Sequence, residues 1–364
     1  MSARLDDPRA LCARLLTGLG LSAAPGCYPL FSKCDEPPTY STTVNLDAAP
    51  VDDTADTAAA VALESCPTDL AEIEQLFRAT GAEVCSVDEA TLVSEEGRDC
   101  AYSYTCWTCC GYGRPYLDAR GEGATAETQP GAGWTRPDAP PEASLLTAEE
   151  RRAVGLYWLE VARSEHSSVA GFHRFALDLL AHGAPPELLA RAQRAAAQEL
   201  RHAMDAFTLA SAYLGEPVGP SPMALGASAP VASSLAELAA WTARDGAIGE
   251  TLAAHLAAAA LHETTDEAAR AVLERVVRDE TEHAELAWAT LRWALATGGD
   301  EVRQAVLATF SRLGAPRSST QGWTLAQTAH GVAAPEQEEA RARTAVDRII
   351  LPVAAALLEA TAHA

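Results

Sequence analysis

The sequence of 364 residues is poor in lysine, in aromatic residues and in long apolar runs. Lys33 is the only lysine, which excludes phosphate-binding loops that end in lysine, kinase-type sites and most Schiff-base chemistry. The best apolar stretch, 252–261, is interrupted by His255 and falls well short of the about 18 residues that a membrane helix needs. We therefore expect no membrane-spanning helix.

Positive charge is also scarce. Lysine and arginine together number 27 against 50 aspartate and glutamate residues, which gives a formal net charge of -23. Such a balance repels nucleic-acid phosphates and anionic lipid head groups. We therefore expect no nucleic-acid partner.

The cysteines divide the chain into two pieces of different character. All nine lie within residues 1–110, and none follows. At about 150 residues per domain, the length also suggests two domains. We expect a cysteine-rich N-terminal region of irregular structure and short strands over 1–145, which includes an acidic run at 48–62, one short helix near 68–80 and a flexible linker at 121–142. Residues 146–364 form the second piece.

The clustered cysteines allow two interpretations, a disulfide framework or a metal knuckle. No histidine precedes His166 to complete a zinc ligand set, which favours disulfides and, with them, export from the cytosol. Residues 4–26 resemble a secretory signal with a lipoprotein-type Cys27, but Asp6 and Asp7 do not suit one. The cytoplasm and the cell envelope both remain open as locations.

From Thr147 onward, apolar residues recur every three or four positions, which predicts amphipathic helices. Helices are expected at 147–180, 185–214, 234–262 and from 265 or 266 to 296, with a long connection at 215–233 and weaker helices at 300–313 and 335–362, the last kinked at Pro352. Two hairpins joined by one long connection predict a mainly α fold, a ferritin-like four-helix bundle with extra C-terminal helices.

Each of the four long helices places a glutamate on its apolar face. Two of the helices carry Glu-x-x-His pairs, in which the glutamate and the histidine share one face. The residues concerned are Glu165, Glu199, His202, Glu250, Glu280 and His283. Buried carboxylates need cations, and the arginines nearest in sequence (Arg163, Arg201, Arg244 and Arg278) fall on other helix faces. The pattern therefore predicts a dinuclear metal site with mixed oxygen and nitrogen ligands.

Over about 147–298, these residues resemble the ferritin-like di-iron carboxylate superfamily. The resemblance implies two iron ions, with manganese as an alternative metal. Glu165 and His202 would be terminal ligands of one ion, Glu250 and His283 of the other, and Glu199 and Glu280 would bridge them. The ligand pattern is closest to O₂-activating oxygenases and oxidases, including arylamine N-oxygenases, although Val276 stands where those N-oxygenases carry a further histidine.

The expected function is that of a non-haem di-iron oxidoreductase, an oxygenase or oxidase that activates O₂ to oxidise or oxygenate a small organic substrate and takes electrons from an external donor. One alternative is ferritin- or rubrerythrin-like iron handling or peroxide detoxification. Another is an envelope-anchored binding protein whose helical bundle no longer has a catalytic role. The C-terminal helices would either form a homodimer contact or pack on the flank of the bundle.

Several neighbours of the predicted ligands are expected to have ordinary structural roles. Asp279 and Glu282 should face solvent beside the ligands of the fourth helix. Trp158, Phe172 and Trp288 should fill the core rather than line a pocket, because aromatic residues at helical spacing usually fill volume.

Overall fold

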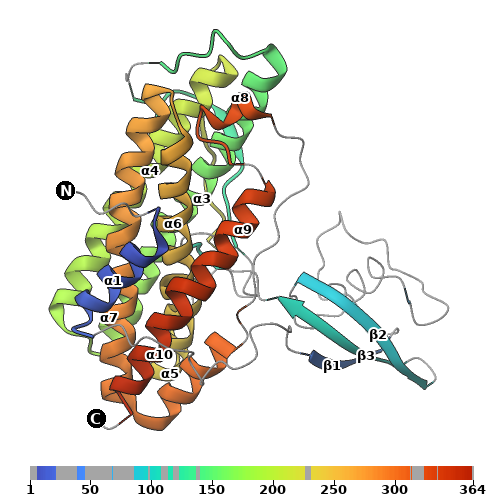
Figure 1. Cartoon of the computed structure of the whole chain (residues 1–364), viewed down its shortest axis with the longest axis vertical. Coiled ribbons are helices and arrows are strands. Elements are labelled where there is room, and N and C mark those ends of the chain that lie inside the picture. The colour runs from blue at the N-terminus through green and yellow to red at the C-terminus, as the bar shows by residue number, and fades with distance from the viewer. Residues whose placement is uncertain are drawn as a thin grey trace. The chain divides into compact units, whose positions relative to one another are not determined.

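The computed structural model is mainly helical, as predicted, and divides into two compact units (Figure 1). One unit comprises Met1–Leu30, Cys110–Ser311 and Arg317–Ala364, and the other comprises Phe31–Cys109 and Arg312–Pro316. The residues that the structure describes are 6–21, 39–45, 68, 86–96, 99–107, 114–117, 123–136, 140–225, 231–311, 313, 324–333 and 335–362.

The first unit contains most of the helices. Its described elements are α1 (Pro8–Gly18), β4 (Thr128–Pro130), α3 (Ala148–Ala181), α4 (Pro186–Leu214), β5 (Val218–Pro220), α5 (Leu235–Trp241), η2 (Thr242–Ile248), α6 (Gly249–Glu263), α7 (Glu267–Ser311), α8 (Leu325–Thr328), α9 (Pro335–Ala345), η3 (Val346–Ile350) and α10 (Leu351–Ala360), of which η2 and η3 are π-helical.

The ends of α3 and α4 follow the predicted signals. The Thr147 hydroxyl accepts a hydrogen bond from the Glu150 amide at 3.2 Å, and Glu150 Oε2 accepts one from the Thr147 amide at 3.0 Å. This reciprocal pair is a capping box. Pro186 occupies the first turn of α4, where no amide hydrogen is needed, and Gly215 ends α4 with a φ of 82°.

The third helical segment differs from its prediction. In place of one helix over 234–262, the structure has α5, the π-helical η2 and α6 in succession. A π turn holds more residues than an α turn, so η2 changes the direction in which later side chains point, beginning with Glu250. The sequence pattern could not show this, because the contacts of Gly246 in η2 come from distant residues, Arg114 and Ala287.

Helix α7 covers both the fourth predicted helix and the one expected at 300–313. Its start is capped by Asp266, whose Oδ1 accepts a hydrogen bond from the Ala269 amide at 2.8 Å. Gly299, with a φ of 63° and a ψ of -147°, interrupts the helical geometry at the predicted junction. The two predicted helices are therefore present, separated by a single break.

Within the first unit, the C-terminal helices pack on the other helices. Helix α9 contacts α6, and α10 contacts α7 and α1, which leaves side chains such as Ile349 and Val353 fully buried. The helix expected over 335–362 is divided into α9, the π-helical η3 and α10, which begins one residue before Pro352, while the expected kink stays a prediction. Among the described residues, no helix has both the length and the apolar character needed to cross a membrane. A homodimer contact stays a prediction.

The expected linker instead packs on the helices over its described residues, 123–136 and 140–142. β4 pairs antiparallel with β5, Arg163 Nε donates a hydrogen bond to the Ala126 carbonyl at 3.0 Å, and the Ser167 hydroxyl donates one to the Ala124 carbonyl at 2.6 Å. Composition could not reveal these partners, because they lie on α3. The domain boundary expected after residue 145 stays a prediction.

The second unit contains a three-stranded antiparallel sheet. The strands β1 (Thr39–Asn45), β2 (Ser86–Glu96) and β3 (Asp99–Trp107) have the order β1-β3-β2. Cys100 on β3 is disulfide-bonded, as the disulfide interpretation expects, whereas Cys12 on α1 of the first unit is a free thiol. The predicted acidic run, and the predicted short helix apart from Thr68, lie outside the described residues.

In the first unit, α3, α4, α6 and α7 run alongside one another (Figure 1). Helix α3 packs on α4, while α4, α5 and α6 each pack on α7. Two clusters of buried apolar side chains fill the interior, one with Trp158 on α3 and the other with Phe172 on the same helix. Glu165 falls between these two residues, so the predicted ligands form a polar layer between two apolar clusters.

Candidate metal centre

The six predicted ligands meet in this polar layer. Glu165 comes from α3, Glu199 and His202 from α4, Glu250 from the first turn of α6, and Glu280 and His283 from α7. The Glu165 side chain is 18% exposed, whereas the other five side chains are exposed by 3% or less. The side of the cluster nearest to solvent is therefore at Glu165.

Both histidines direct Nδ1 toward the carboxylates. His202 Nδ1 lies 3.2 Å from Glu280 Oε1, 3.7 Å from Glu165 Oε2 and 3.8 Å from Glu199 Oε2. His283 Nδ1 lies 3.0 Å from Glu199 Oε1 and 3.5 Å from Glu280 Oε2. Glu199 and Glu280 thus contact both histidines and occupy the middle of the cluster.

The ligand atoms fall into two groups that share Glu280. One group is Glu165, Glu199, His202 and Glu280, and the other is Glu250, Glu280 and His283; within each group, one ligand atom per residue lies within 4.8 Å of the others. Ligands about 2.0–2.2 Å from one ion are themselves about 3–4.4 Å apart. Each group is therefore compact enough to hold a metal ion.

The hydrogen bonding of the cluster supports a cation at this place. Although several distances between histidine nitrogens and carboxylate oxygens are short, these pairs do not meet the geometry of a hydrogen bond. Buried polar atoms without hydrogen-bond partners are rare in proteins. Within the described part of the chain, the atoms without a hydrogen-bond partner include Glu199 Oε2, His202 Nδ1, both carboxylate oxygens of Glu250 and of Glu280, and His283 Nδ1. Because these atoms face one another, metal ions would satisfy them together.

The four carboxyl groups differ in acidity. Burial, with the charges of neighbouring glutamates, raises the pKa of Glu165 and of Glu250 well above its ordinary value. Burial also acts to raise the pKa of Glu199 and of Glu280, but contacts with the two histidines outweigh it and lower both pKa values. The two central carboxyl groups are therefore more acidic than the two outer ones.

The pKa values of the two histidines are both raised. Burial disfavours their charged forms, but the pKa of His202 is raised well above its ordinary value by its contacts with Asp279 and the glutamates. The charge of Glu280 and contacts with Glu199 raise the pKa of His283 to about 9. The raised pKa values of Glu165, Glu250 and both histidines mean that the metal-free cluster favours bound protons, which metal ions would displace.

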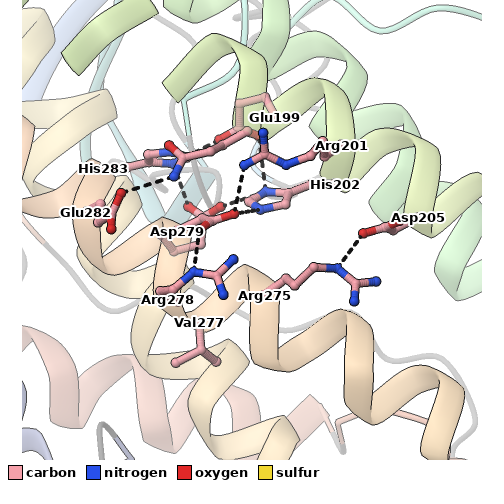
Figure 2. Close-up of polar contacts among 12 residues, drawn as sticks. Glu199, Arg201, His202, Asp205, Arg275, Val277, Arg278, Asp279, Glu282 and His283 are labelled. Atoms are coloured by element: carbon pink, nitrogen blue, oxygen red, sulfur yellow. Dashed lines mark hydrogen bonds and ion pairs between the residues drawn. The ribbon is translucent and has the colours of Figure 1, made fainter. Parts of the chain in front are cut away.

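Asp279 supports His202 from outside the cluster (Figure 2). Its Oδ2 accepts a hydrogen bond from His202 Nε2 at 3.1 Å, Arg278 Nε donates to its Oδ1 at 3.0 Å, and Arg201 lies 3.6 Å away. Burial opposes ionisation, but His202 and Arg278 lower the pKa of Asp279 to about 2. The expectation that Asp279 faces solvent was wrong, because its side chain is buried against His202.

His283 has a different support. Its Nε2 donates a hydrogen bond to Gln198 Oε1 at 3.0 Å, and Gln198 Nε2 donates one to Glu282 Oε2 at 3.1 Å. Glu282 is half-buried and joins this chain of hydrogen bonds, so it is less exposed than expected. Because Nε2 of each histidine donates outward, Nδ1 is the ring nitrogen available to a metal.

Arg114 lies beside the cluster and was missed by sequence reasoning. Its buried guanidinium places Nε 3.8 Å from Glu250 Oε1 and stacks over Phe175, with its central carbon 3.9 Å from the ring centre. Residues near the ligands in sequence were the only cations considered, whereas Arg114 precedes the first ligand by 51 positions (165 minus 114). No periodic signal marks it, because it lies outside the helices.

Side-chain contacts test the prediction that Trp158, Phe172 and Trp288 fill the core. Trp288 donates to the Thr251 hydroxyl at 3.1 Å, and Trp158 donates to the His330 carbonyl at 3.0 Å, so both are core residues as expected. The Phe172 ring centre lies 4.9 Å from that of His283. Phe172 therefore shields a predicted ligand as well as filling volume.

The geometry of the cluster itself is the support for metal binding by this chain. A scan against protein-family models found no match, and searches of curated proteins and of solved structures returned none either.

Proposed function

We propose that the six residues hold two iron ions inside a ferritin-like four-helix bundle formed by α3, α4, the α5–α6 segment and α7. In this proposal Glu165 and His202 bind one ion, Glu250 and His283 bind the other, and Glu199 and Glu280 lie between them. The short distances from both central carboxylates to both histidines support this division. Carboxylate and imidazole ligands suit iron and also manganese.

The observation that carries the proposal is the convergence of buried polar atoms that lack hydrogen bonds. Four carboxylates carry four negative charges when all are ionised, and two divalent ions carry four positive ones. Burying such carboxylates without compensation costs several kcal/mol for each group. Two ions would therefore satisfy both the charges and the orphaned atoms.

We further propose that the protein is an oxidoreductase that uses O₂ to oxidise or oxygenate a small organic substrate. A pair of ferrous ions at such a site supplies the electrons that reduce O₂, and an external donor must restore them. Asp279 and Gln198 fix the histidine rings by accepting from Nε2. Phe172 keeps water from the His283 side. Substrate and O₂ would approach at Glu165, the most exposed of the six side chains.

The proposal is tested by loading metal-free protein with Fe(II) under anaerobic conditions, counting bound iron, and then admitting O₂ while recording visible absorbance. Two irons per chain and a transient absorbance band, followed by single-turnover oxidation of an added organic substrate, are expected. An exposed glutamate on the same helix gives a matched control: Glu274→Ala should load iron normally, whereas Glu280→Ala should not. Unchanged iron content in Glu280→Ala would contradict the proposal and favour a bundle without a metal role.

A second candidate, iron handling without an organic substrate, is favoured by one observation. Two cavities in the described part of the chain, of about 780 and 350 Å³, are lined by residues other than the six ligands. The larger is lined instead by Arg136, Asp205 and Arg275, among others. The same O₂ experiment separates the candidates, because rapid mineral formation or preferential consumption of peroxide would indicate iron handling.

A further inference from the structure

Arg114 reaches the cluster from a chain segment outside the ligand-bearing helices, and this segment is held in place at several points. The Tyr116 amide donates a hydrogen bond to the Ser167 hydroxyl at 3.0 Å, and the Tyr116 hydroxyl donates one to the Leu225 carbonyl at 2.8 Å. Tyr116 is itself buried. The position of Arg114 is therefore fixed by hydrogen bonds to the first unit's own helices and loops.

Two helices leave room for this segment by carrying glycine. A Cβ atom on Gly171 of α3 would overlap the backbone carbonyl oxygen of Arg114, and one on Gly246 of η2 would overlap its guanidinium. Any other residue at either position would displace the arginine. The π-helical segment that carries Gly246 thus provides the space for Arg114 directly before Glu250.

Burial lowers the pKa of the Arg114 guanidinium, and the negative charges of Glu250, Asp245 and Asp178 act against this shift. Arg114 Nε makes no hydrogen bond within the described residues, and neither oxygen of Glu250, its neighbour at 3.8 Å, makes one. The rings of Phe175 and Phe172 pack against the cation, at 3.9 and 5.3 Å from its central carbon. A permanent positive charge is therefore held beside one predicted ligand and shielded from water.

We propose that Arg114 is a positioning residue of the metal centre, which holds the Glu250 carboxylate and makes the Glu250–Glu280–His283 group bind its ion more weakly than the Glu165–Glu199–His202–Glu280 group. This inference rests on the proposed metal binding. It adds to that proposal that the two ligand groups bind metal with unequal affinities and that Arg114 causes the difference.

The physical cause is charge. An ion bound by Glu250 lies close to the guanidinium, and two cations at such a separation in a site shielded from water repel each other. Arg114 also competes with the ion for the same carboxylate. The other group has no comparable disadvantage, because Arg201 and Arg278 contact Asp279 on the outer side of His202. The Glu250 group should therefore fill second.

In the experiment, metal-free protein is titrated with Co²⁺ or Mn²⁺, because these ions avoid reaction with O₂. Binding is followed by isothermal titration calorimetry and by visible or magnetic-resonance spectra. The wild-type protein should bind two ions in two resolved steps. In Arg114→Met, which keeps the length of the side chain and removes its charge, the weaker step should tighten by roughly tenfold or more. Arg114→Lys keeps the charge and should stay close to the wild-type protein.

Thermal unfolding separates this role from simple packing. Arg114→Met leaves Glu250 without its cation, so the metal-free variant should melt below the wild-type protein, and saturation with metal should remove most of the difference. Arg163→Met is the matched control, because Arg163 anchors the nearby segment through Thr125 and Ala126 but does not contact the cluster. It should lower stability equally with and without metal and leave both affinities unchanged.

Several results would overturn the inference. They are equal affinities in the wild-type protein, no tightening in Arg114→Met, the same change in Arg114→Lys, or loss of both binding steps in Arg114→Met. Should Arg114→Met not fold, Arg114→Gln takes its place, and failure of both to fold would make Arg114 a packing residue. Absence of any binding to the wild-type protein is a different result, which refutes the proposed metal function itself.

Discussion

Asp279 on α7 accepts a hydrogen bond from His202 on α4 at 3.1 Å, and the equivalent residue on α4, Gln198, accepts one from His283 on α7 at 3.0 Å. In each Glu-x-x-His pair, the residue before the glutamate thus supports the histidine of the other helix. The exchange ties α4 to α7 at the level of the cluster. One support is an anion and the other a neutral amide, so the two histidines are not equivalent.

Replacing Asp279 with asparagine should weaken metal binding at the His202 group. The variant keeps the size of the side chain but removes the negative charge that makes His202 a stronger metal ligand. Loss of such an outer partner typically costs about 10–100-fold in metal affinity. Competition titration against a chelator measures the change. The exposed Asp300→Asn is the control, and an Asp279→Asn affinity equal to that of the control would contradict the assigned role.

Metal binding should release protons and become more favourable as the pH rises. Groups whose pKa is raised on folding stabilise the protein below their ordinary pKa, and this contribution is lost as the pH rises through the raised value. His202, His283, Glu165 and Glu250 all have raised pKa values, that of His283 reaching about 9. Metal-free protein should therefore lose stability from pH 6 to pH 9.

The metal-loaded protein should lose much less over the same range, because ions replace the protons. Near pH 6, saturation with divalent metal should release protons from these groups, and above pH 9 it should release fewer. Calorimetry in buffers of different ionisation enthalpy counts them. A proton count near zero at pH 6 would mean that the cluster does not bind metal through these four groups.

Substituting alanine for Gly171 should destabilise the protein. The added Cβ would overlap the backbone carbonyl oxygen of Arg114, which cannot move away as a flexible side-chain tip could. Overpacking of this kind costs about 1–3 kcal/mol. Gly18→Ala, in open space on helix α1, is the control and should be neutral or slightly stabilising. Chemical denaturation of both variants provides the comparison, and equal stabilities would contradict the packing described for the Arg114 segment.

Local signals in the sequence were sufficient for three of the ligand-bearing helices, α3, α4 and α7. The capping box at Thr147, the proline at Pro186 and the glycines at Gly215 and Gly299 each mark a helix end through interactions within a few residues. The ligand pattern was equally readable, because helical spacing alone places a glutamate and a histidine three apart on one face.

Other features depend on contacts between distant parts of the chain, which periodicity does not encode. The π-helical η2 accommodates Arg114, more than a hundred positions away in sequence, so pattern analysis read it as ordinary helix. Asp279 appeared to belong to a solvent face of α7, but helix α4 covers that face with His202. The described linker residues found partners on α3 that their own composition did not suggest.

The central claim, that buried carboxylates and histidines from four helical segments hold metal ions, is tested most directly by counting metal in the purified protein. Elemental analysis of wild-type protein reconstituted with Fe(II) under anaerobic conditions and freed of loose metal should give two ions per chain. Glu280→Ala, which removes the residue shared by both groups, should give fewer than one. A wild-type protein that retains no metal, or a Glu280→Ala variant that retains as much as the wild-type protein, would contradict the account.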